Sequence, residues 1–246
     1  MTSRPYNRSR SSDPARWVLT GDPLTVGPDG IQVSGGSTNV VIDNPITVPA
    51  GSTLGVRADP FATATLNGVI SGAGGLTLGS STDGTGFGGL VVLTANNTYT
   101  GTTVVQDTAA RIDGHQPGSA VSDTNAGELA GGGTIGALKV DGTSALDFAD
   151  EATDFDHCPQ TLTVDGTLLF EAGAYFSPAI QACGTPAVQT VGSVLVTGAA
   201  TVSKDVTLFL SLDRDQPQLA CLLASQGALQ GQFAGVKEGS TKTGVH

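Results

Sequence analysis

Charged and aromatic side chains are scarce in this sequence of 246 residues: charged residues make up 13% of the chain and aromatic residues 5%. The 11 basic residues are outnumbered by 22 acidic ones, which gives a formal net charge of -11. An acidic surface repels the phosphate backbone, so we expect no nucleic-acid partner. With so few charges, most of the polar surface must come from Thr, Ser, Asn and Gln. Such a surface is common in extracellular β-rich proteins.

Long apolar runs are also missing. No stretch reaches the roughly 18 residues that a membrane-spanning helix needs, so no membrane insertion by this segment is expected. The first residues, MTSRPYNRSRSSDPARWVL, carry arginines without an apolar core behind them, and no signal peptide is seen in this chain. A signal upstream, another export route and no export all stay open. We expect residues 1–16 to be a disordered basic tail and residues 237–246 a flexible C-terminal end.

Short apolar runs punctuated by turn formers are abundant. With 39% hydrophobic residues, the chain can form a core despite its 35 glycines and 12 prolines. The runs Leu76–Leu78, Leu90–Leu93 and Thr102–Val105 are rich in β-branched residues and are bounded by Gly, Asn and Ser, a pattern typical of strands. No helix of useful length is predicted, and Pro217–Leu229 is interpreted as strand plus turn because Gly227 interrupts it.

Several phrases resemble the passenger-associated repeat of bacterial autotransporters. ISGAGGLTLG (70–79) and GLVVLTANNTYTGTTVV (89–105) are similar to its wording "GxGGLTLxGxxTYTGxTxV". GELAGGGTIGALKVDGTSAL, TLTVDGTLLFEAGAYF and PQLACLLASQGALQGQFAGV resemble later phrases, so the likeness covers residues 24–236. It implies an all-β, single-stranded right-handed parallel β-helix (solenoid) over residues 17–236. The segment after Val236 does not resemble the linker helix and membrane barrel that follow a passenger in that family.

In a solenoid each coil hides its apolar side only against its neighbours. A period of 20–25 residues predicts nine or ten coils, with inward side chains such as Leu76 and Leu78, Leu162 and Val164, and Leu208 and Leu210. Tyr99, Phe170, Tyr175, Phe176, Phe209 and Phe233 fall in or beside the runs and are interpreted as core or stacking residues. A carbohydrate platform would need two or three of them on one outer face. The open ends of such a stack predict end-to-end self-association.

Three cysteines are present, so at least one is unpaired. Cys158 and Cys183 are about one coil apart, which would place them on adjacent rungs, and we predict a disulfide between them. The alternative is that all three cysteines, Cys221 included, are small buried hydrophobic residues.

An acidic insert, ADEATDFDHCPQ (149–160), stands where the resemblance leads us to expect a Pro-Gly-Ser turn. Its Asp150, Glu151, Asp154 and Asp156, beside Asp147 and His157, offer the hard oxygen ligands that Ca²⁺ prefers. Paired carboxylates also serve polysaccharide-cleaving enzymes. A solvated loop between two coils is the third interpretation. Apart from this Ca²⁺ no cofactor is expected.

The sequence contains no GxSxG, HExxH, CxxC or GxxxxGK[ST] motif. The resemblance therefore implies a non-enzymatic β-helix, associated with the bacterial cell surface or outer membrane or secreted, that serves adhesion, display or structural projection. Its partner would be a host or cell-surface glycan or protein. A polysaccharide-active lyase or hydrolase and a self-assembling scaffold module are the alternatives.

Overall fold

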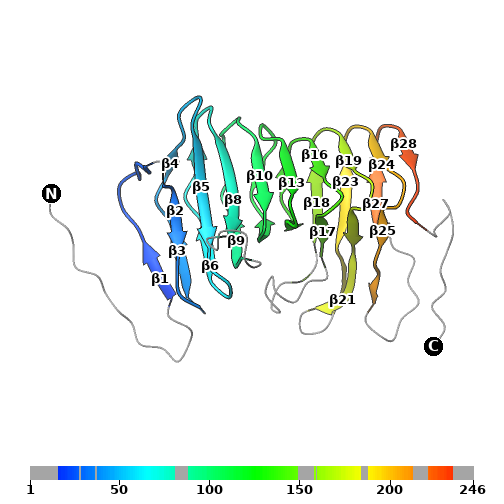
Figure 1. Ribbon diagram of the computed structural model, residues 1–246, viewed down its shortest axis with the longest axis horizontal. Helices are drawn as coiled ribbons and strands as arrows, with labels where there is room; N and C mark the ends of the chain where they lie inside the picture. Colours follow the sequence, from blue (N-terminus) through cyan, green and yellow to red (C-terminus); the bar gives the residue numbers. More distant parts are fainter. Residues whose placement is uncertain are drawn as a thin grey trace.

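The protein is a stack of parallel strands, wound so that the chain advances from one end of the stack to the other (Figure 1). The computed structural model describes residues 16–27, 29–36, 38–80, 88–148, 158, 160–183, 188–212 and 221–234, and for 181–183, 188–189 and 211–212 only the backbone. Within these ranges every regular element is a strand. The predicted class, an all-β parallel β-helix, is confirmed.

Two long sheets and one shorter sheet form three faces of the coil. The first face has nine strands in the order β1 (Arg16–Leu19), β3 (Asn39–Ile42), β6 (Thr63–Leu66), β9 (Leu90–Leu93), β11 (Ala109–Ile112), β14 (Glu128–Ala130), β17 (Ala145–Asp147), β20 (Tyr175–Ser177) and β25 (Thr207–Leu208). The second face has nine strands in the order β2 (Ile31–Val33), β5 (Thr53–Ala58), β8 (Gly75–Ser80), β10 (Thr103–Gln106), β13 (Val121–Thr124), β16 (Leu138–Val140), β19 (Leu168–Phe170), β24 (Ala200–Val202) and β28 (Leu229–Gly231). At about 4.8 Å per strand, each stack is about 38 Å long.

The third face is shorter and interrupted. Its strands are the pair β4 (Ile46–Thr47) and β7 (Ile70–Ser71), and the sheet β12 (His115–Gln116), β15 (Thr134–Ile135), β18 (Thr161–Val164), β23 (Ser193–Val196) and β27 (Leu223–Ser225). Asn97 joins the two parts, because its side chain accepts a hydrogen bond from the Ile70 amide (2.8 Å) and donates one to Gln116 (3.0 Å).

The core is a set of rows in which side chains from equivalent positions lie one above another. One row on the second face runs through Val56, Leu78, Val105, Asp123, Val140 and Phe170, all fully buried. The predicted inward positions Leu76, Leu78, Leu162 and Val164 are confirmed as buried. Leu208 and Leu210 are only half-buried. Leu208 belongs to β25, the last described strand of the first face, so no further described strand covers it.

A chain of polar side chains runs through the core near the third face. The Tyr99 hydroxyl accepts a hydrogen bond from Gln116 (2.8 Å) and shares another with Thr103 (2.6 Å). Thr103 in turn bonds Ser119 (2.9 Å), and Asn97 bonds Gln116. All five side chains are buried. Because each of these bonds satisfies a group that has no access to water, the chain fixes neighbouring coils against each other.

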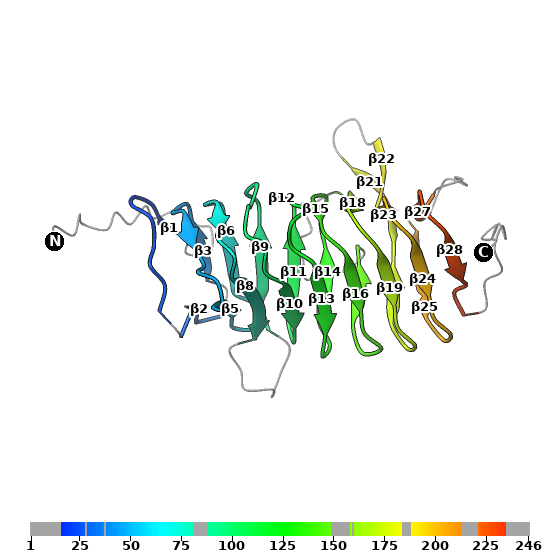
Figure 2. The same ribbon diagram turned by 90° about the horizontal axis from the view of Figure 1, so that it is seen from above.

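The coils differ in length more than the predicted period of 20–25 residues allows. Hydrogen-bonded neighbours on adjacent coils are 17 residues apart between Ala126 and Thr143 and 32 apart between Thr161 and Ser193. The ladders stay in register because the extra residues leave the coil at its corners. An example is the antiparallel pair β21 (Ala179–Cys183) and β22 (Val188–Val191), which projects from the stack in Figure 2. β21 also pairs with β26 (Ser211–Leu212).

Tight corners depend on glycine where two coils touch. Gly131 lies between β14 and β15 with φ +132°, and a Cβ there would collide with the carbonyl oxygen of Ile112 on the preceding coil. Only glycine combines this backbone angle with such a close approach.

Candidate functional site

A hollow of about 380 Å³ opens on the outer side of the first face, across β14, β17, β20 and β25. Its described lining consists of two carboxylates, two aromatic rings, hydroxyl groups and small residues: Ala126, Gly127, Glu128, Thr143, Ala145, Asp147, Tyr175, Ser177, Thr207 and Phe209. The volume lies within the range of small-ligand pockets. This is our candidate functional site.

Strand alternation explains why these side chains point outward. In β20 the buried Phe176 faces the core, so Tyr175 on its N-terminal side must face solvent, and 49% of it is exposed. In β17 Leu146 faces inward, which leaves Ala145 and Asp147 on the outer surface. Phe209 continues the ladder after β25 by donating its amide hydrogen bond to the Phe176 carbonyl (2.9 Å), and it is 64% exposed.

The strand register sorts the lining into two parallel rows. The first row runs Glu128, Ala145, Tyr175, Thr207. The second row lies two residues further along each strand and contains Asp147 and Ser177, followed by Phe209. The small Ala145 side chain separates Glu128 from Tyr175, which creates the depression between them.

Carboxylates and aromatic rings occupy opposite ends of the hollow. Glu128 and Asp147 are on neighbouring strands and offset by two residues, which puts their Cα atoms about 8 Å apart. Tyr175 and Phe209 have the same relationship at the other end. The residues that line the hollow in the described part of the chain include no Lys, Arg or His.

A buried carboxyl lies directly behind one wall of the hollow. Asp123 on β13 is fully buried in the inward row between Val105 and Val140, and neither of its carboxyl oxygens has a hydrogen-bond partner. A Cβ on Gly127, which lines the hollow, would collide with Asp123 Oδ1. Burial, followed by repulsion from Asp141 and Glu128, raises the pKa of Asp123 well above its ordinary value.

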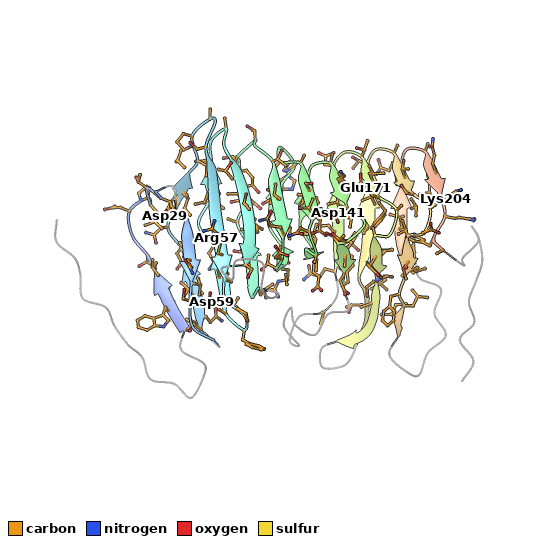
Figure 3. The ribbon with its side chains drawn as sticks, in the orientation of Figure 1. Asp29, Arg57, Asp59, Asp141, Glu171 and Lys204 are labelled. Atoms are coloured by element: carbon orange, nitrogen blue, oxygen red, sulfur yellow. The ribbon has the colours of Figure 1, made fainter. Side chains whose placement is uncertain are left out.

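The pKa of Asp141, on the neighbouring coil, is shifted in the opposite direction. Burial alone would raise its pKa, but hydrogen bonds from Thr143, from the Asn125 amide and from Ser144 outweigh this and lower the pKa of Asp141. Asp141 and Glu171 follow the paired strands β16 and β19 on successive coils (Figure 3). Glu171 forms an ion pair with Lys139 (3.0 Å).

The predicted calcium ligands lie outside the residues that the structure describes. Asp150, Glu151, Asp154, Asp156 and the neighbouring His157 belong to that segment, so calcium binding there stays a prediction. Asp147 is described, and it lines the hollow instead. Across the described ranges, no three His, Cys, Asp or Glu side chains are grouped so that they could hold a metal ion.

The disulfide between Cys158 and Cys183 also stays a prediction, because the structure describes only the backbone of Cys183. Cys221 is a free, exposed thiol. This corrects the alternative in which all three cysteines are buried: Cys221 lies just before the short end strand β27, where no further described coil covers it.

The interpretation of the aromatic residues holds for Tyr99, Phe170 and Phe176, which are buried, and for Phe233, which is half-buried and packs on both phenylalanines. It is wrong for Tyr175 and Phe209 as core residues, since both lie on one outer face. The sequence contains a sign of this for Tyr175, because it is adjacent to Phe176 and two successive strand residues cannot both face the core.

Comparison with protein-family models, curated proteins and solved structures finds no match to this chain. The described part of the chain contains no helix with the length and apolarity needed to traverse a lipid bilayer.

Proposed function

We propose that this protein is a non-enzymatic bacterial β-helix, exposed on the cell surface or secreted, that serves in adhesion, display or structural projection as autotransporter passengers do. The observation that carries the proposal is the hollow on the first face, where two exposed aromatic rings and two partly exposed carboxylates are held by paired strands. Side chains held in this way are ready to bind without a loss of backbone freedom. The phrases that resemble the passenger repeat support the same proposal.

Location is the first test of this proposal. Intact cells that express the natural full-length protein would be treated with a protease that cannot enter them, and the culture medium would be probed in parallel. The proposal expects cleavage on intact cells or protein in the medium, while a cytoplasmic marker stays intact. Protein that is protected until the cells are lysed would contradict it.

A polysaccharide-active enzyme is the second candidate, and the two carboxylates of the hollow favour it. Glu128 and Asp147 lie on neighbouring strands of the hollow, and glycosidases use a pair of carboxylates as acid and base or nucleophile. A reducing-end assay on neutral and acidic polysaccharides tests it. Activity that is lost in both Glu128→Gln and Asp147→Asn would establish the enzyme and overturn the non-enzymatic proposal.

Self-association at the ends of the stack is a further possibility that the exposed end strands support. In β28 all three residues are exposed, and Leu229 is 46% exposed, although Ala200 and Leu168 at the equivalent position inside the stack are buried. An outer strand with unpaired backbone groups can add a strand from another copy. Sedimentation velocity across a range of concentrations would show oligomers that grow with concentration if the ends associate. One concentration-independent monomer would exclude it.

A further inference from the structure

We infer that the hollow on the first face binds a neutral oligosaccharide, with Tyr175 and Phe209 packing against sugar rings and Glu128 and Asp147 accepting hydrogen bonds from sugar hydroxyls. The inference deepens the proposed function and rests on it for its biological setting. The binding site itself is argued from the lining residues alone.

The two aromatic side chains form a platform. Tyr175 lies on β20, and Phe209 directly follows the neighbouring strand β25, offset by two residues; about half or more of each residue is exposed to water. An aromatic ring has a large apolar face that a flat apolar partner can cover. The apolar C–H faces of pyranose rings are flat partners of that kind. Tyr175 also brings a hydroxyl group that can bond at the edge of a sugar.

The polar groups of the hollow suit a ligand that carries many hydroxyl groups. Ser177 and Thr207 contribute hydroxyls to the lining beside the carboxylates, whereas the Thr143 hydroxyl is already bonded to Asp141. A carboxylate accepts hydrogen bonds only, and a bond from a sugar hydroxyl to a charged acceptor is about twice as strong as one between neutral groups. These groups therefore match the donors that ring the edge of a sugar.

Charge decides which sugars fit. The described lining contains two acidic groups and no basic one, and the chain as a whole carries a net charge of -11. Uronic acids and sulfated sugars carry negative charge, which no basic side chain of the described lining would offset. Neutral sugars are therefore the class that suits both the carboxylates and the aromatic rings of the hollow.

Size favours a short saccharide over a protein surface. The hollow is a depression of about 380 Å³ across four strands, a volume in the range of small-ligand pockets. From β14 to β25 the row is about 14 Å long, which suits a short oligosaccharide laid along the stack. A basic peptide is the competing occupant that the two carboxylates would attract.

The experiment uses the purified full chain in native gels that contain one polymer each: hydroxyethylcellulose, dextran, glucomannan or polygalacturonate. An oligo-arginine peptide is tested separately by calorimetry. We expect retardation by at least one neutral polymer and none by polygalacturonate. Tyr175→Ala and Phe209→Ala should each weaken that binding about two- to twelvefold, since an aromatic contact contributes roughly 0.5–1.5 kcal/mol. Both residues are exposed, so folding should not change, which circular dichroism checks.

Phe61→Ala is the matched control. Phe61 is 85% exposed between β5 and β6, away from the hollow, so its replacement should leave binding unchanged. Three results would overturn the inference: no binding to any neutral polymer, equal binding by the Tyr175→Ala and Phe209→Ala variants, or binding of oligo-arginine in place of sugar. Sugar binding by a protein that never leaves the cytoplasm would overturn the proposed function and leave the inference standing. Surface exposure without sugar binding would overturn the inference and leave the proposed function standing.

Discussion

Replacing Asp123 by valine should make the protein more stable at neutral and alkaline pH. Its carboxyl is fully buried without a hydrogen-bond partner in a row of apolar side chains. Because burial and the repulsion from Asp141 and Glu128 raise its pKa well above 3.8, the folded protein keeps a proton that the unfolded chain has already released. The contribution of this proton to the free energy of unfolding is therefore fully present below about pH 3.8. It is lost as the pH rises through the raised pKa of the folded protein.

The size of the effect follows from what the substitution removes. A buried polar group without a partner costs about 1–3 kcal/mol, and Asp123→Val eliminates this cost while it continues the apolar row between Val105 and Val140. We expect a gain of about 1–3 kcal/mol at pH 8, with a melting temperature higher by about 2–4 °C per kcal/mol. Asp123→Asn is the matched control, since it removes the titration but keeps an amide without partners.

The assay is urea unfolding followed by circular dichroism at pH 4, 6 and 8 for the three chains. The free energy of unfolding of each variant, minus that of the wild type, should grow with pH. The valine chain should exceed the asparagine chain at every pH. A wild type as stable as Asp123→Val at pH 8, or a difference that does not change between pH 4 and 8, would refute the reasoning.

Three further predictions concern stability and use the same unfolding assay. Tyr99→Phe should cost about 1–3 kcal/mol, because the hydroxyl that accepts the bond of a buried amide is lost; an unchanged midpoint would contradict this. Gly131→Ala should lower the free energy of unfolding by more than about 1 kcal/mol. Gly51→Ala should lower it less, because φ is also positive there but no atom lies within 4 Å of the new Cβ. Equal losses would show that the close approach at Gly131 is unimportant. Asp141→Asn should cost no more than about 1 kcal/mol at pH 7, since the group is largely solvated. This loss should disappear as the pH falls below 3.8 through the lowered pKa, and it is measured in the Asp123→Asn background so that their repulsion does not contribute.

The fold could be predicted from the sequence because its cause is local. Each run such as Leu76–Leu78 alternates apolar and polar residues and ends at turn formers, and the confirmed burial of Leu76 and Leu78 follows directly from that alternation. The inward position of Asp123 could have been found in the same way, since it lies two residues after the buried Val121.

The candidate site could not be found in this way, because it depends on which coils lie next to each other. Glu128 is opposite Ala145, 17 residues later, whereas Ala145 is opposite Tyr175 across a coil of 30 residues. No fixed period brings these three together. Only the completed register shows that carboxylates and aromatic rings share one face.

The unequal coils also have a mechanical consequence. A force that pulls the two ends of the stack apart acts along the inter-strand hydrogen bonds, so coils would peel away one after another. Each released coil adds a contour length fixed by its own number of residues, from about 60 Å for 17 residues to about 110 Å for 32. The force–extension curve of a single molecule would therefore show a series of unequal steps. The length of each step would identify the coil that has just unfolded.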